Sequence, residues 1–139
     1  MSQADKFTQS FKKQVYYSDF FTDLSPHPET LDLVRNVNEL AIKRALKNLF
    51  NTDPGERWFN PSLGSNIRKY LFEPIDPVTT QKIKLAVAET IEKHERRIKL
   101  LNLEVTPDEA RNGYTVSLQY LIQNTQQPIT TDIVLTRVR

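Results

Sequence analysis

The C-terminal third of the chain alternates apolar and polar residues in three separate segments. A period of two places every second side chain on the same face of a β-strand. The residues expected to share the buried face are Leu101, Leu103, Val105, Tyr114, Val116, Leu118, Tyr120, Ile122, Ile129, Thr131, Ile133 and Leu135. Asn112-Gly113 lies between the first two segments and is a strong signal for a β-hairpin. We therefore predict three antiparallel strands over about 98–106, 114–123 and 129–138.

A long helix is expected immediately before these strands. Asp76-Pro77 indicates an N-cap residue followed by proline at the first helical position, and the helix is predicted to run to about residue 95. Its apolar stripe is expected to consist of Ile83, Val87, Thr90, Ile91 and His94. Leu85 lies outside the stripe and is a candidate for a second contact.

Shorter elements are expected upstream of that helix. Asn38 can cap a helix over about 39–50, and Ser65 can cap a short helix over about 66–72. A short strand is expected within residues 31–37. The residues expected to face the core are Leu40 or Ala41, Ala45, Leu46, Leu49, Phe50, Ile67, Tyr70 or Leu71, and Phe72. The predicted fold class is α+β, with N-terminal helices and one long helix packed on a small antiparallel sheet of about three C-terminal strands.

The N-terminus is rich in aromatic residues. We predict an arm over residues 1–24, followed by a single α+β domain over residues 25–139. The aromatic residues of the arm are Phe7, Phe11, Tyr16, Tyr17, Phe20 and Phe21. Acidic Asp5, Asp19 and Asp23 dilute its positive charge, which disfavours a tail that stacks on nucleic acid. The arm is expected either to pack on its own domain or to dock on a partner.

Residues 51–64 form a predicted loop that holds the only tryptophan of the chain. Arg57 can bind carbonyl or carboxylate oxygens through its planar guanidinium, or it can hold the loop together. Trp58 is expected to be either a plug in the core or an anchor at an interface. Phe59 and Pro61 are expected to be structural and to fix the loop against the helices.

Composition excludes several kinds of site. The 139 residues include no cysteine, two histidines and three glycines, so thiol chemistry, histidine-rich metal sites and glycine-rich phosphate loops are not expected. We expect no cofactor and no metal. A net charge of +2 does not by itself indicate nucleic-acid binding. The chain lacks an apolar run near 18 residues and a signal peptide at its start, so no membrane partner is expected, and we expect synthesis in the cytosol.

Paired carboxylates are the catalytic chemistry that the composition leaves open. Glycoside hydrolysis needs two carboxyl groups across a cleft, one of them with a raised pKa. Glu73 with Asp76 and Glu89 with Glu92 are the available pairs, but each has an ordinary explanation in helix capping or a solvated helix face. His94 lies on the apolar stripe of its helix. No catalytic residue is therefore assigned, and we expect the protein not to be an enzyme.

Three segments carry a resemblance to a known family. The block from Gly55 to Pro74 has the pattern G-x-R-x-F-x-P-x-x-G, followed by a short helix that ends in Leu-Phe-Glu. Tyr17-Ser18-Asp19 precedes this block, and Glu95-Arg96-Arg97 follows it. From about residue 17 to the end, the chain resembles the contractile-tail baseplate wedge and sheath-initiator proteins of T-even-like phages and their type VI secretion relatives. Arg96 replaces the proline of the family's Glu-Pro-Arg motif and can let the helix run one or two residues further.

The resemblance implies a structural role and specific partners. Glu95 and Arg97 are expected to attach the protein to the core bundle of the baseplate wedge. The strand that contains Ile133 and Leu135 is expected to belong to an open sheet that accepts strands from the tail sheath protein. Arg57 and Trp58 complete the candidate partner-binding residues. Tail tube or hub proteins are further candidate partners.

Alternative functions remain open at this point. They are a lysozyme-like cell-wall glycoside hydrolase, a baseplate component of a type VI secretion system, and an α+β adaptor with a nucleic-acid-binding arm. The leading hypothesis places the protein in the baseplate of a virion tail, assembled in the host cytoplasm. In that hypothesis no nucleic-acid partner is expected.

Arg137 and Arg139 in the last strand are of the type that protects an exposed sheet edge.

Overall fold

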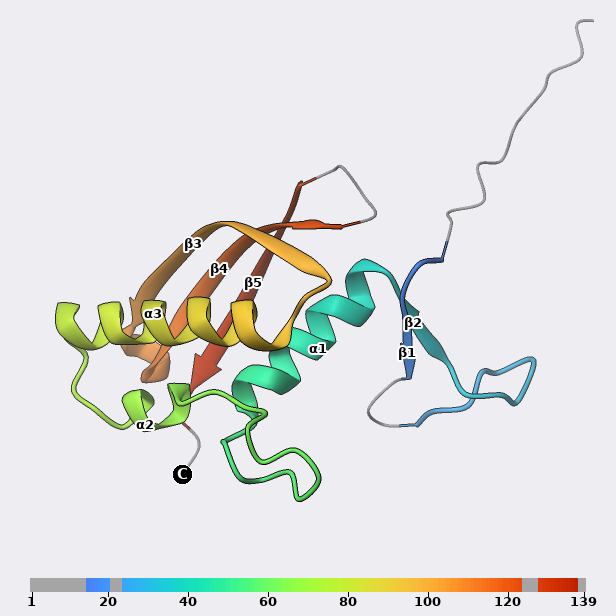
Figure 1. Ribbon diagram of the computed structural model, residues 1–139, viewed down its shortest axis with the longest axis horizontal. Coiled ribbons are helices and arrows are strands. Elements are labelled where there is room, and N and C mark those ends of the chain that lie inside the picture. The colour runs from blue at the N-terminus through green and yellow to red at the C-terminus, as the bar shows by residue number, and fades with distance from the viewer. Residues whose placement is uncertain (1–14, 21–23, 124–127, 138–139) are drawn as a thin grey trace, which may run out of the picture.

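The computed structural model describes residues 15–20, 24–123 and 128–137 and shows the predicted α+β fold (Figure 1). Its elements are β1 (Ser18–Phe20), β2 (Arg35–Val37), α1 (Glu39–Asn51), α2 (Ile67–Leu71), α3 (Pro77–His94), β3 (Ile98–Asp108), the 3-10 turn η1 (Glu109–Arg111), β4 (Gly113–Ile122) and β5 (Pro128–Thr136). Phe7, Phe11 and Phe21 of the predicted arm lie outside the described residues, as does Arg139. Within the part of the chain that is described, no helix is long and apolar enough to cross a membrane.

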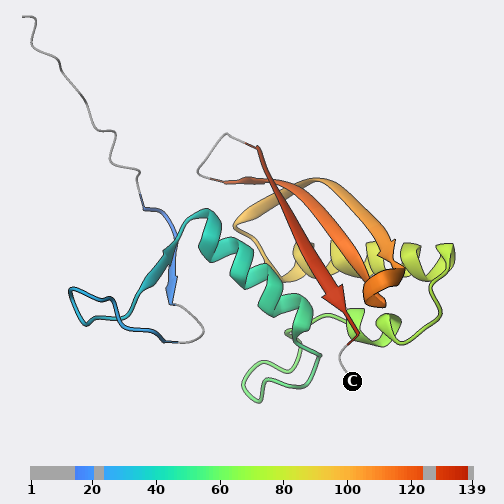
Figure 2. The same ribbon diagram turned by 180° about the vertical axis from the view of Figure 1, so that it is seen from behind.

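The three predicted C-terminal strands form one antiparallel sheet in the order β3-β4-β5. On β4 every residue expected on the buried face is at most 2% exposed. On β5, Thr131, Ile133 and Leu135 are buried, and Ile129 is half-buried. The period-of-two prediction is therefore confirmed for these two strands. Figure 2 shows β5 at one edge of the sheet.

The prediction for β3 is wrong at Leu101, which is 49% exposed. The pairing of β3 with β4 shifts register between Leu100 and Asn102, as in a β-bulge. An extra residue in one strand reverses the faces on which the following side chains lie. Leu103 and Val105 accordingly point into the core, while Leu101 at the register shift stays half exposed.

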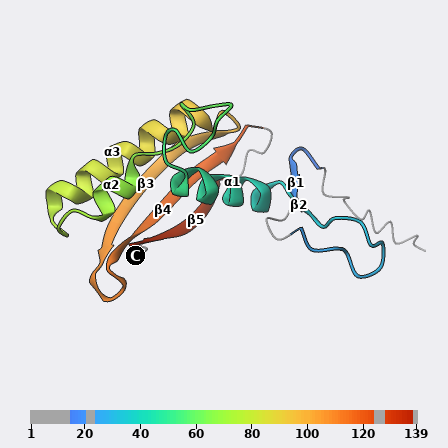
Figure 3. The ribbon, with the colours of Figure 1, turned by 90° about the horizontal axis from the view of Figure 1, so that it is seen from below.

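Helices α1 and α3 share one core with the inner face of the sheet. Figure 3 shows the two helices beside the sheet from below. The buried residues of the two helices are Ala41, Ile42, Leu46, Leu49, Phe50, Thr79, Ile83, Val87, Thr90 and Ile91. Leu40 is 58% exposed, so Ala41 rather than Leu40 faces the core. The predicted cap of α3 is confirmed, because the Thr79 N–H donates to Asp76 Oδ1.

The connection between β3 and β4 explains why the predicted hairpin has glycine at position 113. Asn112 adopts the left-handed conformation with φ of 47° after η1. The backbone of β5 lies against Gly113, where a Cβ atom would be 2.3 Å from the carbonyl oxygen of Leu135. Gly113 therefore permits the close approach of the neighbouring strand.

The N-terminal part of the structure differs from the prediction. The strand predicted within residues 31–37 is limited to β2, which pairs antiparallel with β1, while Leu31 is 80% exposed. Asn38 precedes α1 as expected, but its side chain makes no capping hydrogen bond. Its Oδ1 instead accepts from the N–H groups of Tyr16 and Tyr17 at 2.9 and 3.3 Å. Asn38 therefore fastens the start of the described chain to α1.

The region around α2 corrects two further predictions. Asn66, not Ser65, is the N-cap residue of α2, and the buried Ser65 hydroxyl donates to the carbonyl of Phe50 at 2.8 Å. Phe72 is 50% exposed rather than inward. The Arg137 guanidinium stacks over the Phe72 ring and donates to its carbonyl at 2.8 Å. Arg137, the residue that follows β5, therefore connects the end of that strand to the end of α2.

Candidate partner-binding surfaces

Glu95 and Arg97 form a paired unit where α3 ends and β3 begins. The Arg97 guanidinium binds both carboxylate oxygens of Glu95, with 2.6 Å between Nε and Oε1 and a second bond from Nη2 to Oε2. The Glu95 side chain is 7% exposed and the Arg97 side chain 34%. Bidentate, charge-assisted bonds of this kind fix the orientation of both groups. The bonds to Glu95 raise the pKa of Arg97 above its usual value.

The N-terminal segment completes the surroundings of Arg97. The ring of Tyr17 lies 5.7 Å from the Arg97 guanidinium, within the range of a cation–π contact. The charge of Asp19 also favours the protonated guanidinium and raises its pKa. Sequence reasoning placed Tyr17 in a family motif but did not assign it to this site. Tyr17, Glu95 and Arg97 are brought together because Asn38 holds the segment before β1.

Arg96 does not extend the helix, contrary to the prediction. Helix α3 ends at His94, and Glu95 leaves the helical conformation with φ of −121° and ψ of 81°. The bidentate bond between Glu95 and Arg97 requires this turn, so the chain ends the helix without the family's proline. Arg96 is exposed and makes no ion pair within the residues that the structure describes.

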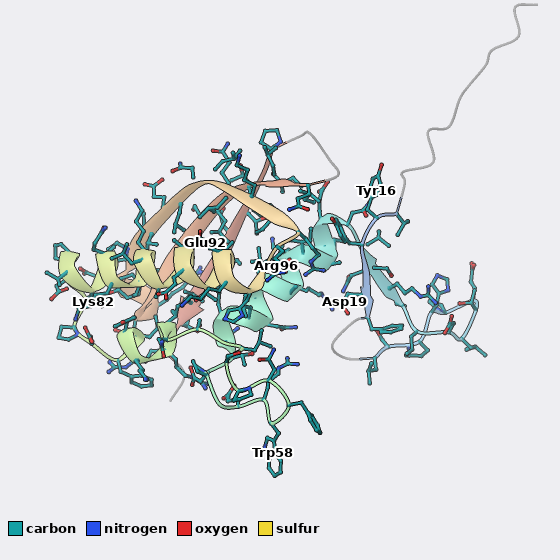
Figure 4. All side chains as sticks on the ribbon, viewed as in Figure 1. Tyr16, Asp19, Trp58, Lys82, Glu92 and Arg96 are labelled. Carbon is teal, nitrogen blue, oxygen red and sulfur yellow. The ribbon has the colours of Figure 1, made fainter. Side chains whose placement is uncertain are left out.

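Trp58 and Phe59 are neither buried nor packed against the helices. Their exposed fractions are 93% and 105%, so Trp58 is not a core plug and the structural role predicted for Phe59 is wrong. Figure 4 shows Trp58 at the outer end of its loop. Pro61 does contribute to the loop, because its carbonyl accepts from the Gly55 N–H at 2.9 Å. Phe59 lies between two turn signals, Asp53-Pro54-Gly55 and residues 60–64, in a stretch with neither helical nor strand periodicity. That lack of periodicity is the sequence signal for an exposed Phe59.

Ile133 and Leu135 occupy core positions of β5, with exposed fractions of 4% and 2%. Their side chains are therefore inaccessible to a partner. The strand that contains them is an edge of the sheet, because β5 pairs only with β4 among the described strands. A partner can reach the outward-facing backbone of β5 and its exposed side chains.

Three of the four carboxylates considered for catalysis, Glu73, Asp76 and Glu89, make local contacts. Lys82 donates to Glu73 at 2.9 Å, and Lys93 pairs with Glu89. The Thr79 N–H bond lowers the pKa of Asp76, and the Lys93 bond lowers the pKa of Glu89. A catalytic acid needs the opposite shift, a raised pKa. Asp76 and Glu89 therefore lack the raised pKa that the acid of a glycosidase pair needs.

A cavity of about 490 Å³ lies between the loop, α2 and α3. Glu89 is the one carboxylate among its lining residues, and Lys82, Lys93 and His94 line it as well. A single carboxylate does not supply the two carboxyl groups of glycoside hydrolysis. The described residues also contain no cluster of three or more histidine, aspartate or glutamate residues that could hold a metal ion.

Three solved structures share the fold at low sequence identity. A protein of Geobacter sulfurreducens that carries the name tail lysozyme matches with a TM-score of 0.63 and 24% identity, over 70% of this chain and 89% of its own. A chain of the anti-feeding prophage baseplate matches with a TM-score of 0.60 and 22% identity, over 88% and 87%. A chain of the type VI secretion system baseplate complex matches with a TM-score of 0.51 and 17% identity, over 70% and 93%.

Sequence comparison identifies the family. Baseplate wedge protein gp25 of Enterobacteria phage T4 is 27% identical over 90 residues, which cover 63% of this chain and 68% of the phage protein. The family model for baseplate wedge protein gp25 matches residues 37–127, a stretch that begins just before α1 and includes β3 and β4. Because this match takes in well over half of the 139 residues, the chain belongs to the gp25 family of baseplate wedge proteins.

Proposed function

We propose that the protein is a non-enzymatic structural component of a contractile tail baseplate. In this proposal it is bound to the core bundle of the wedge and initiates the tail sheath by accepting a β-strand at β5. Its place is the tail baseplate of a virion, which it joins in the host cytoplasm. Family membership supports the baseplate role, and the open edge of β5 is the observation that carries the proposal for the sheath.

The outer edge of β5 offers a row of unpaired backbone groups. The Arg137 N–H donates to the Asn112 carbonyl on the β4 side. Because hydrogen-bonding direction alternates along an antiparallel strand, residues 129, 131, 133 and 135 also bond toward β4. The residues whose N–H and C=O groups point outward are Thr130, Asp132, Val134 and Thr136. An added strand can pair with this row through main-chain hydrogen bonds.

The opposite edge of the sheet is less suited to strand addition. Strand β3 contains the register shift between Leu100 and Asn102 and has proline at position 107. The register of β3 with β4 directs the backbone of Pro107 outward, where no N–H is present to donate. Bulges and prolines interrupt edge pairing. Strand β5 has its proline, Pro128, at the first position and is uninterrupted from there to Thr136.

The end of α3 can supply the contact to the wedge core. A guanidinium has five N–H donors, and in Arg97 one donor on Nε and one on Nη2 bind the carboxylate of Glu95. The remaining donors of the partly exposed Arg97, together with the exposed Arg96, can bind carboxylate or carbonyl oxygens of a partner. Glu95 acts as an internal support that fixes the position of Arg97, since it is itself buried.

The sheath proposal is tested by Val134→Pro, with Val134→Thr as the matched control. Proline removes one outward N–H without removing a bond to β4, whereas threonine keeps that N–H. We expect both variants to fold and to enter baseplates. Sheath-bearing tails should fall by about tenfold for Val134→Pro only, because several copies each lose a main-chain bond. Counts by electron microscopy and immunoblots of purified baseplates provide the two readouts.

Two results would contradict this assignment in different ways. Normal sheath on baseplates that contain Val134→Pro removes the β5 edge from the mechanism. Absence of the unmodified protein from purified baseplates contradicts the structural role as a whole.

The wedge contact is tested separately with Arg96→Glu and Arg96→Lys. Because Arg96 is exposed, neither change should alter thermal unfolding. We expect the reversed charge to reduce incorporation into baseplates and the lysine variant to retain most of it. Equal incorporation of both variants removes Arg96 from the binding surface.

A further inference from the structure

The loop between α1 and α2 displays two aromatic side chains on a hydrogen-bonded turn. The Asn60 N–H donates to the Arg57 carbonyl at 3.1 Å, which closes a four-residue β-turn. Trp58 and Phe59 occupy the two central positions of that turn. Glycine, proline, asparagine and serine are the usual residues there, so two large aromatic side chains have no explanation in turn geometry.

The loop is held in place by its own hydrogen bonds. Two further turns are closed by the bonds from Glu56 to Asp53 and from Leu63 to Asn60, each at 3.1 Å. The Gly55 N–H donates to the Pro61 carbonyl across the loop, and the Ser65 N–H donates to the Thr52 carbonyl at its base, both at 2.9 Å. None of these bonds involves an aromatic ring. The two rings are therefore presented by a backbone that is ordered without them, which reduces the entropy lost on binding.

The charges of the loop are distributed unevenly. Arg68 forms ion pairs with Asp53 at 3.2 Å and with Glu56 at 3.6 Å. Glu56 also accepts from the Asp53 N–H at 3.0 Å. Arg57, next to the exposed rings, has no ion pair or side-chain hydrogen bond to another described residue. The acidic groups of the loop are thus already paired, and Arg57 remains available to a carboxylate from outside.

We propose that the Trp58–Phe59 turn inserts into an apolar pocket of a neighbouring baseplate protein, with a carboxylate at the rim of that pocket binding Arg57. The inference rests on the proposed baseplate role, but it describes a contact separate from the β5 edge and from the Glu95–Arg97 pair. Exposed tryptophan and arginine side chains are the residue types that dominate binding at protein interfaces. A ring pair with a flanking guanidinium fits a pocket that is apolar inside and acidic at its edge.

The first test measures incorporation into baseplates in competition with the unmodified chain. We expect Trp58→Ala, Phe59→Ala and Arg57→Glu each to reduce incorporation by at least about tenfold. Arg57→Lys and Val78→Ala serve as controls, the second because Val78 is an exposed apolar residue on α3, 63% exposed. Both controls should incorporate within about twofold of the unmodified chain. Undiminished incorporation of the two alanine variants overturns the inference, while the baseplate role stands if the unmodified chain is present.

The second test identifies the partner directly. Phe59 is replaced by the photoreactive residue p-benzoylphenylalanine, and assembled particles are irradiated. We expect the adduct to map to apolar residues of another baseplate protein, with aspartate or glutamate nearby. An adduct that maps to a second copy of this chain, or no adduct in particles that contain the variant, overturns the inference.

A membrane is the other environment that accepts exposed aromatic rings. Trp58 is the only tryptophan, so its fluorescence reports on this turn alone. With vesicles of phosphatidylcholine and phosphatidylglycerol, we expect no blue shift and no protection from acrylamide quenching. A blue shift with these vesicles would reassign the turn to a lipid surface and overturn the inference.

Discussion

Strand β4 and the loop from Thr52 to Gly64 both carry large apolar side chains, but they use them in opposite ways. The two tyrosines of β4, Tyr114 and Tyr120, are at most 1% exposed. The two aromatic residues of the loop are almost fully exposed. Strand β4 is ordered by burial between two strands and two helices, whereas the loop is ordered by its own backbone hydrogen bonds.

The difference separates the residues that maintain the fold from those that are available to partners. Burial of apolar area supplies most of the folding free energy, so the buried apolar residues of β4 cannot be truncated without loss of stability. The loop contributes its backbone to the structure and leaves its rings free. Substitutions in the two regions should therefore change different measurements, and the following predictions test that separation.

The largest effect is expected in the core of the sheet. Leu118 is 0% exposed at the centre of β4. Leu118→Ala should lower the free energy of unfolding by about 3 kcal/mol, because it removes buried methyl groups and leaves a cavity. Urea denaturation followed by circular dichroism measures this change. Ser117→Ala, on the outer face of the same strand, is the control and should change stability by less than about 0.5 kcal/mol.

Substitutions in the Glu95–Arg97 pair are expected to lower stability less than those in the core of β4 and more than those of the exposed loop rings. Glu95→Ala should destabilise the protein by about 2 kcal/mol, since the guanidinium loses its buried partner but keeps access to water. Arg97→Glu places a second carboxylate beside the buried Glu95 and should destabilise the fold as well, so a loss of baseplate binding by this variant would have two causes. Thermal unfolding of both variants checks these expectations, and unchanged stability of Glu95→Ala would contradict a structural role for the pair.

The glycines of the loop test whether its backbone is fixed. Gly64 has φ of 141°, and an added Cβ would lie 2.7 Å from the carbonyl oxygen of Thr52. Gly64→Ala should therefore cost about 2 kcal/mol through backbone strain and displacement at the base of the loop. Gly55 has φ of 92° but open space around it, so Gly55→Ala should cost about 1 kcal/mol. Equal and negligible effects in denaturation experiments would show that the loop adapts freely.

The regular part of the fold could be predicted from the sequence because it has a period. Alternation on β4 and β5, the stripe of α3 and the Asp76-Pro77 start each depend on neighbours a few residues apart. The irregular part could not, since it depends on contacts between distant segments. Asn38 has the residue type of a helix cap, yet its side chain binds the backbone of Tyr16 and Tyr17. The bulge that turns Leu101 outward similarly depends on the pairing of β3 with β4.

The candidate site was predictable only in outline. The family motif selects Glu95 and Arg97, but not their mutual bidentate bond or the Tyr17 ring beside them. Ile133 and Leu135 lie on an edge strand as expected, but their side chains are buried, and the accessible groups are the outward backbone of their neighbours. The prediction that Phe59 fixes the loop against the helices is wrong, because local hydrogen bonds order this turn without burying its side chains.

The smallest effect on stability is expected where the effect on binding is greatest. The Trp58→Ala/Phe59→Ala double variant should unfold within about 0.5 kcal/mol of the unmodified chain, because neither ring contributes to the core. Trp58 fluorescence of the unmodified chain provides a second measurement. The Trp58 indole is 93% exposed in the folded protein, so it already contacts solvent as it would in the unfolded chain. Urea unfolding should therefore abolish the circular dichroism signal and leave the wavelength of Trp58 emission nearly unchanged. A marked red shift on unfolding would show that the native fold shields the ring, and the contrast between β4 and the loop would no longer hold.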